Sequence, residues 1–347
     1  MSQNNKVFLK GMNLAELEEW CSENNFPNFR AKQMYQWMYL HGAIQAEKMM
    51  NLPKDCIDTI QKTGVLSTLN LVSQTTSENN QTIKYLFKTS KGHFIESVSM
   101  IDENDRHTVC ISSQSGCNLG CDFCATAKMG LLQNLSCGEI IDQLIFIRQS
   151  SDTPINNVVY MGMGEPFLNY DNVIKSAGIA NDKNGFNIGV KKITISTVGI
   201  VPKIKRFIDE EIKFGLAISL NASNDLVRDA IMPVNKKWPI EDLINMNKMY
   251  AKKYKRNKIT FEYVIMDGIN SSTSDAVELS KILNSAKCKV NIIPYNETDG
   301  KYKRPSDSTI NKFIETLYLH NDNFQILVRW SNGLDIDAGC GQLAVAQ

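Results

Sequence analysis

The sequence predicts an α/β fold in which a partial, barrel-like parallel sheet follows a small helical domain. From about residue 107 onward, strand patterns and helix patterns alternate six times. Such alternation is typical of a parallel sheet covered by helices, with right-handed crossovers. The residues before about 95 carry helical apolar spacing instead. With 347 residues and 43% hydrophobic content, the chain can bury one large core and a smaller accessory domain.

The first part of the chain predicts helices and one hairpin. Apolar residues recur at helical spacing over 13–42, where Pro27 interrupts the pattern, and again over 52–64. Residues 77–100 alternate apolar and polar side chains on both sides of a Lys-Gly turn, which is typical of a hairpin. We therefore expect an accessory domain over residues 1–95 and a catalytic core over residues 96–347.

The second part predicts six strand–helix units. Strands are expected at 107–114, 156–162, 191–197, 214–220, 258–266 and 288–296. Helices are expected at 136–149, 170–180, 201–210, 239–254, 274–286 and 309–320. Ser136 and Glu139 stand in capping-box positions, and Pro202 falls in the first turn of its helix. In barrels of this kind the chemistry lies at the carboxyl ends of the strands.

A cysteine triplet follows the first of these strands. In "CISSQSGCNLGCDFCATAKMG" (110–130), Cys117, Cys121 and Cys124 have the spacing C-x-x-x-C-x-x-C. Structural zinc takes four protein ligands, usually as two close pairs, and this segment lacks the second pair. Three thiolates on a 4Fe–4S cluster would leave one iron open to bind a substrate. Packing of buried cysteines is the alternative, but the polar and turn-forming residues between them make a poor core strand.

Short polar motifs follow the other expected strands. "MGMGEP" (161–166) comes after the second strand, and its glycines would let the backbone approach a ligand while Glu165 accepts a hydrogen bond from an ammonium group. "STVG" (196–199), "SLNAS" (219–223) and "YN" (295–296) end later strands. Each alone is an ordinary loop cap. Their shared position at successive strand ends favours one common site.

The composition of the chain limits the protein class and the expected cellular location. The net charge of +1 does not indicate a general nucleic-acid binder. No stretch approaches the roughly 20 apolar residues of a membrane span, and the first residues lack a secretory signal, so we expect a cytoplasmic protein with free thiols. The basic run "KMYAKKYKRNK" (248–258) contains tyrosines that could stack on bases, although taken alone such a run is more often a solvated helix face.

The triplet and the Gly-Glu-Pro turn resemble the radical S-adenosylmethionine superfamily. The 110–130 segment, "MGMGEP", "ISTVGIVP" and "DIDAGCGQL" are similar to the RlmN/Cfr family of RNA adenine methyltransferases, from about Phe29 to Leu343. The resemblance implies that the cysteine triplet holds the cluster and that the Gly-Glu turn holds the amine of S-adenosylmethionine. It further implies cofactor contacts at Gly164, Glu165, Ser196, Ser219, Leu220, Asn221 and Asn296. Asn221 departs from the histidine that is usual in the family, and we expect binding to survive.

The resemblance also implies a mechanism with two further thiols. Cys340 would take a methyl group from a first S-adenosylmethionine, and a radical formed from a second molecule would activate that group for addition to adenine. Cys110 would then release the RNA by forming a transient disulfide with Cys340, and Glu96 would take the ring proton. The remaining cysteines match no functional position, and we interpret them as packing residues: Cys21, Cys56, Cys137 and Cys288.

The family divides by the carbon that is methylated. One branch acts on carbon 2 of an adenine in 23S ribosomal RNA and of an adenine beside the tRNA anticodon, and a resistance branch acts on carbon 8 of the ribosomal adenine. The proline of Gly-Glu-Pro resembles the first branch. The resemblance implies RNA docking through the helical domain and the basic run, a reductant such as flavodoxin or ferredoxin, and a monomer. Alternatives are carbon 8 methylation, a radical enzyme with a small substrate, and a non-enzymatic RNA-binding protein.

Overall fold

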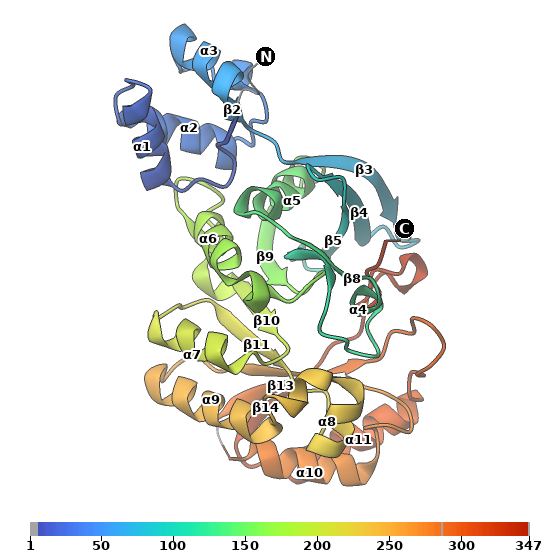
Figure 1. The fold of residues 1–347 in the computed structure, drawn as a ribbon. Helices are drawn as coiled ribbons and strands as arrows, with labels where there is room; N and C mark the ends of the chain where they lie inside the picture. Colours follow the sequence, from blue (N-terminus) through green and yellow to red (C-terminus); the bar gives the residue numbers. More distant parts are fainter. Residues whose placement is uncertain (1–5, 286, 346–347) are drawn as a thin grey trace.

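The computed structural model describes residues 6–285 and 287–345, and one ten-stranded sheet organises most of them (Figure 1). Its strand order is β14-β13-β12-β11-β10-β9-β6-β5-β4-β3. The strands from β6 to β14 pair in parallel, and those from β6 back to β3 pair antiparallel. Within the described residues β14 and β3 do not pair, so the sheet is a partial barrel, as the sequence predicts.

The parallel wall confirms the six strand–helix units. Its strands are β6 (His107–Cys110), β9 (Ile155–Tyr160), β10 (Ile193–Thr197), β11 (Gly215–Ser219), β12 (Thr260–Ile265), β13 (Cys288–Pro294) and β14 (Phe324–Val328). Its helices are α5 (Cys137–Gln149), α6 (Tyr170–Asn181), α7 (Val201–Asp209), α8 (Asp225–Ile231), α9 (Ile240–Lys253), α10 (Thr273–Leu283) and α11 (Asp307–Leu319). Strand β14 and helix α8 were not expected from the sequence.

Local sequence signals account for several helix starts. Ser136 and Glu139 form the expected capping box of α5, in which each side chain accepts a hydrogen bond from the other residue's backbone N–H. Pro202 lies in the first turn of α7, where its missing N–H costs no hydrogen bond. The helices therefore begin where the sequence predicts.

The hairpin before the parallel wall belongs to the same sheet. Strands β3 (Leu69–Thr76), β4 (Thr82–Thr89) and β5 (Phe94–Ile101) pair in order, and β5 pairs with β6. Residue 95, where the expected domain boundary lies, is inside β5. The helical part of the chain ends earlier, at β2 (Gly64–Val65). The division into domains with separate roles stays a prediction.

The N-terminal helices form a separate unit at the top of Figure 1. It contains β1 (Val7–Phe8), α1 (Leu14–Glu23), α2 (Phe29–Tyr39), the 3-10 turn η1 (Ala46–Lys48) and α3 (Lys54–Thr63). The unit docks on α5 through a buried ion pair of 3.6 Å between Lys10 Nζ and Asp142 Oδ1. Gly11 approaches the backbone of Gly138 so closely that no Cβ would fit between them.

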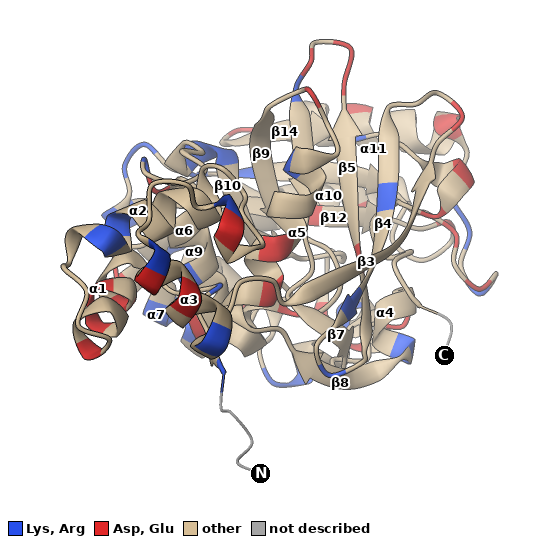
Figure 2. Ribbon diagram, turned by 90° about the horizontal axis from the view of Figure 1, so that it is seen from above, with Lys and Arg blue, Asp and Glu red and all other residues tan. Residues whose placement is uncertain are grey.

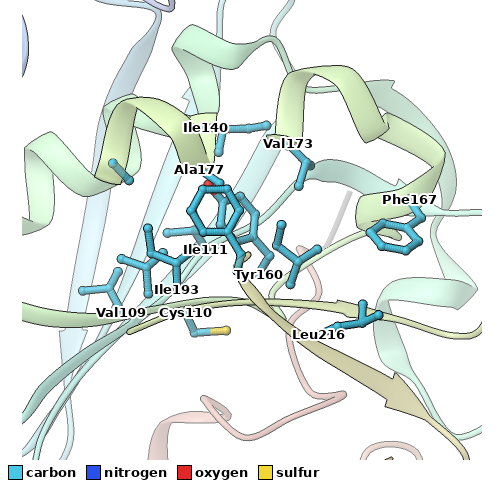
Figure 3. Close-up of a cluster of buried hydrophobic side chains, with 14 of the residues drawn as sticks. Val109, Cys110, Ile111, Ile140, Tyr160, Phe167, Val173, Ala177, Ile193 and Leu216 are labelled. Carbon is cyan, nitrogen blue, oxygen red and sulfur yellow. The ribbon is translucent and has the colours of Figure 1, made fainter. Parts of the chain in front are cut away.

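A buried apolar layer separates the outer helices from the inside of the barrel (Figure 3). Val109 and Ile111 are both buried, and Ile111 lies with Tyr160 on the side where the helix residues Ile140 and Val173 pack. The sulfur of Cys110 points to the opposite side of the strands. Successive side chains of a strand point to opposite faces, so this alternation directs Cys110 into the barrel. The four cysteines expected to be packing residues are buried, as predicted: Cys21, Cys56, Cys137 and Cys288.

The basic run at 248–258 forms the end of α9 and the loop before β12. Tyr250 is buried, and its ring packs on that of Tyr254 with 4.6 Å between centroids. Base stacking by Tyr250 is therefore wrong, because its apolar ring is part of the core. Lys and Arg are mixed with Asp and Glu over the elements seen in Figure 2, in keeping with the net charge of +1. No helix within residues 6–285 and 287–345 has the length and apolar run that crossing a bilayer requires.

Candidate active site

A cavity of about 1020 Å³, open at one end, lies at the carboxyl ends of the parallel strands. We call it the cluster cavity. It brings together most of the residues that the sequence predicts for the site, which come from segments far apart in the chain: Cys117, Cys121, Cys124, Gly164, Glu165, Ser196, Ser219, Asn221 and Cys340. The barrel topology explains this convergence, because parallel strands end at the same edge of the sheet.

The three cluster cysteines lie on one wall of this cavity. Cys117 ends β7 (Gln114–Cys117), which leaves the main sheet and pairs with β8 (Gly130–Asn134), so the expected strand at 107–114 is two strands. Cys121 and Cys124 lie in the following loop, before α4 (Ala125–Lys128). Burial raises the pKa of the Cys117 thiol to about 11, and raises that of Cys121 further. Only a strongly cationic partner would deprotonate such thiols.

The donor set fits a cluster better than a single ion. Among the described residues, no three His, Cys, Asp or Glu side chains converge on one metal ion. The three thiols of the triplet line the same cavity and lie close enough to influence one another's pKa, and this donor set suits a multi-iron cluster with one open iron.

Arg228 of α8 is a buried cation beside this wall, and it was missed from the sequence. It is fully buried and donates hydrogen bonds to the carbonyl oxygens of Val198 (2.7 Å), Ser219 (3.0 Å) and Leu220 (2.9 Å). It therefore ties together the ends of β10 and β11. Within the described residues no carboxylate lies within 4.0 Å of it, and its charge lowers the pKa of Cys121 against the effect of burial. An anionic, thiolate-ligated cluster would compensate this buried charge.

The Gly-Glu turn after β9 is tightly packed. Gly164 has a φ of +96°, and a Cβ there would overlap the side chain of Gln114. Glu165 is buried, and its two carboxylate oxygens accept hydrogen bonds from the backbone N–H groups of Phe167 and Val198, both at 2.9 Å. Burial raises its pKa to about 7. Each carboxylate oxygen keeps a further lone pair, so an ammonium donor can still be accepted.

The other expected cofactor contacts divide into two groups. Ser196, Ser219 and Asn221 line the cluster cavity, while Leu220 and Asn296 do not. The Asn221 side chain accepts a hydrogen bond of 2.9 Å from the backbone N–H of Val264, which joins β11 to β12. Asn221 has a φ of +58°, a left-handed conformation that asparagine tolerates better than most residues.

Asn296 and Glu96 hold the segment that carries Cys340. Asn296 Nδ2 donates to the Cys340 carbonyl oxygen at 3.1 Å. Glu96, buried on β5, accepts a hydrogen bond of 3.0 Å from the backbone N–H of Ala344 and lies 3.4 Å from the Lys84 ammonium group. Burial raises the pKa of Glu96, and Lys84 opposes that shift. Glu96 does not line the cluster cavity, and its role as a base stays a prediction.

Cys110 and Cys340 share a second, smaller cavity, which we call the thiol cavity. Both are free thiols in the structure, so the transient disulfide is not observed. Burial, and to a lesser degree Cys340, raises the pKa of Cys110 to about 12. Arg329, which follows β14, lines the same cavity, and the nearby Cys340 is the main cause that raises the pKa of its guanidinium group. Arg329 was missed because β14 was missed.

Glu262 is a further buried group that the sequence did not reveal. It lies on β12, lines the cluster cavity, and accepts a hydrogen bond of 2.8 Å from Asn291 Nδ2. From the sequence "KITFEYVIM", Glu262 would be expected on the exposed face of a strand. In the structure, this face of β12 points into the barrel, so Glu262 is buried. Burial raises its pKa from 4.5 to about 7, opposed by Arg329 and by Asn291.

The raised pKa of Glu262 predicts a loss of stability as pH rises. A carboxyl group whose pKa is higher in the folded state stabilises the fold fully below pH 4.5, and this contribution disappears as pH rises through about 7. At pH 5 the free energy of unfolding of Glu262→Gln should therefore be similar to that of the unmodified protein. At pH 8 it should be higher than that of the unmodified protein by up to about 3 kcal/mol. Urea unfolding at both pH values measures this. Glu103→Gln, at an exposed turn, is the control, and equal pH dependence in all three proteins would contradict the prediction.

Comparisons with known proteins agree with this geometry. The family model described as the radical SAM superfamily matches residues 111–279, and the ribosomal RNA large subunit methyltransferase N-terminal domain matches residues 7–64. The chain is 40% identical over 323 residues, 93% of each chain, to a probable dual-specificity RNA methyltransferase RlmN of Pseudothermotoga lettingae. It is 39% identical to the dual-specificity RNA methyltransferase RlmN of Geotalea uraniireducens, over 97% of this chain and 96% of that one.

A solved structure is similar over nearly the whole chain. It is a radical SAM methyltransferase from Sphaerobacter thermophilus, with a TM-score of 0.92 and 40% identity. The match covers 97% of this chain and 99% of that one. The N-terminal helices and the partial barrel are therefore shared features of these proteins.

Proposed function

Because the chain belongs to the RlmN family of radical S-adenosylmethionine RNA methyltransferases, we propose that it methylates carbon 2 of adenine in 23S ribosomal RNA and in tRNA beside the anticodon. As a member of this family, the enzyme uses a 4Fe–4S cluster and two molecules of S-adenosylmethionine per turnover. The observation that supports the proposal most strongly is that Cys340 lines both the cluster cavity and the thiol cavity of Cys110.

Cys117, Cys121 and Cys124 would hold the cluster, which when bound supplies the electron that starts radical cleavage of S-adenosylmethionine. Gly164 would bring its backbone to the amine of that molecule, with Glu165 fixing the turn. Ser196, Ser219 and Asn221 would orient the rest of the cofactor from neighbouring strand ends. Leu220 and Asn296 do not line the cavity. Leu220 would therefore contribute through its backbone, and Asn296 through its hydrogen bond to the Cys340 loop.

Cys340 would act as the methyl carrier. A thiolate is a good nucleophile toward a sulfonium methyl group, whereas an electron-poor adenine carbon is not. The position of Arg329 supports this role, because its guanidinium lines the thiol cavity together with Cys340. After the methyl carbon has bonded to adenine, Glu96 would remove the ring proton and Cys110 would attack the Cys340 sulfur. The sulfur–carbon bond would then break, the released carbon would take a proton to become the methyl group, and the Cys110–Cys340 disulfide would be returned to thiols by a reductant.

The preference for carbon 2 rests on Pro166. It completes the Gly-Glu-Pro turn and begins the 3-10 turn η2 (Pro166–Asn169), whose N–H at Phe167 holds Glu165. A reductant such as flavodoxin or ferredoxin, action as a monomer, and a cytoplasmic location with the RNA substrates belong to the same proposal.

The product decides between the branches of the family. RNA treated with anaerobically reconstituted enzyme, S-adenosylmethionine and a reductant should contain 2-methyladenosine after digestion to nucleosides, as measured by mass spectrometry. The Cys340→Ala variant, which lacks the carrier, should form none. Finding 8-methyladenosine alone would assign the enzyme to the resistance branch, and finding neither product with an intact cluster would contradict RNA methylation.

A further inference from the structure

A third cavity opens to solvent at the other end of the barrel, and neither the cluster nor the cofactor contacts involve it. We call it the lower cavity; it measures about 930 Å³ with its open mouth. Its walls include Thr108 of β6, Asn157 of β9 and Thr194 of β10, which lie in the amino-terminal parts of these strands. The cluster cavity is lined from the carboxyl ends of the same sheet. The two cavities therefore approach the barrel interior from opposite ends.

The thiol cavity, with an empty volume of about 350 Å³, lies beside both and shares wall residues with each. It shares Met100, Arg329 and Asn332 with the lower cavity. It shares Met161, Cys340 and Leu343 with the cluster cavity. Cys340 therefore lines both the cluster cavity and the thiol cavity, and Cys110 lines the thiol cavity with it.

Cationic side chains outnumber acidic ones on the walls of the lower cavity, where Asp102 pairs with Arg106 at 3.0 Å, so the cavity suits an anionic, aromatic ligand. Lys191 and Lys192, in the 3-10 turn η3 (Val190–Lys192), are exposed at its rim, and within the described residues neither has a carboxylate within 4.0 Å. Arg329 lies at its inner end, where the thiol cavity begins. Trp330 is 50% exposed on its wall, and the Arg304 guanidinium lies 5.6 Å from its ring centroid. Unpaired cations beside an exposed aromatic ring are typical of sites for single-stranded nucleic acid, where phosphates bind the cations and a base stacks on the ring.

We propose that the lower cavity is the entrance through which the target adenosine reaches Cys340, with the adjoining RNA held by Lys191, Lys192 and Trp330. This inference rests on the proposed function. The cofactor would fill much of the cluster cavity at the carboxyl end of the barrel, which leaves the lower cavity as a second approach toward the Cys340 loop. An adenine must leave its stack to react, and an entrance with a stacking platform for a neighbouring base lowers the cost of that step. Lys191 and Lys192 would bind flanking phosphates, and Trp330 would replace a lost base stack.

Binding of an anticodon stem-loop RNA that carries the target adenine tests this entrance. The double variant Lys191→Ala/Lys192→Ala should bind the RNA about tenfold more weakly, and the slope of log Kd against log salt concentration should fall by about 1–2. Trp330→Ala should weaken binding by roughly 5- to 100-fold, and Trp330→Phe should restore much of it. Lys281→Ala/Lys312→Ala removes two exposed lysines of α10 and α11 and is the matched control.

Three readouts separate the possible failures. Iron content and RNA-independent methylation of Cys340, measured by peptide mass spectrometry, should be unchanged in every variant, because neither involves the lower cavity. An unchanged Kd and salt slope in the Lys191/Lys192 variant, or equal weakening in the control, would overturn the entrance while leaving the methyltransferase assignment intact. If the unmodified enzyme methylates Cys340 but transfers nothing to any RNA, the proposed function itself fails.

Discussion

Cys117→Ala should contain almost no intact cluster and should not cleave S-adenosylmethionine. A cluster held by three thiolates cannot keep its geometry on two, and the other cysteine among the residues that line the cluster cavity, Cys340, is the proposed methyl carrier. The loss should be complete for radical cleavage, since that step requires the open iron. Iron and sulfide analysis of anaerobically reconstituted protein, the visible absorbance of the cluster, and the yield of 5′-deoxyadenosine measure the two effects together.

Cys288→Ala provides the matched control. Cys288 is fully buried on β13 and lines none of the three cavities, so the substitution removes a thiol from the core and leaves the site intact. It should keep its iron and its cleavage activity, with a modest loss of stability of about 1 kcal/mol. A Cys117→Ala protein with full iron and sulfide would show that the triplet is not the ligand set.

Cys110→Ala should accumulate a covalent RNA–protein adduct. Cys340 should still accept the first methyl group, and the activated carbon should still add to adenine, because neither step needs a second thiol. Release should then stop, since Cys110 is the thiol that lines the thiol cavity with Cys340, whereas the other nearby thiols belong to the triplet. The adduct should appear as a shifted band on a denaturing gel, and ribonuclease should reduce it to a nucleotide-sized mass on the peptide that contains Cys340.

Two variants control this experiment. Cys340→Ala should form no adduct, because the carrier is absent, and Cys21→Ala should behave as the unmodified enzyme because Cys21 is buried in the N-terminal helices. Turnover of Cys110→Ala at the native rate without an adduct would mean that Cys110 only packs inside the barrel. In that case another group must release the RNA.

Much of the fold could be predicted because its signals are local. The capping box of Ser136 and Glu139, Pro202 at a helix start, and the alternation of β4 and β5 each act within a few residues. The elements that were missed have weak local signals. Strand β14 is five residues long with exposed positions at Gln325, Leu327 and Val328, and it forms only because β13 offers an open edge. Helix α8 spans seven residues and is held by the hydrogen bonds of Arg228.

By itself the sequence predicted candidate site residues from the spacing of the cysteine triplet and the turn at Gly164, and it predicted the thiols Cys110 and Cys340 only through the family resemblance. Only the tertiary structure decided what surrounds them. Burial of Glu262 and Arg228, the position of Arg329 between two cavities, and the burial of Tyr250 within an apparent RNA-binding run depend on contacts between distant segments. A short-range sequence pattern specifies the local backbone and the type of side chain. The pKa of a buried group and its access to solvent depend instead on how much water the packed chain excludes around it.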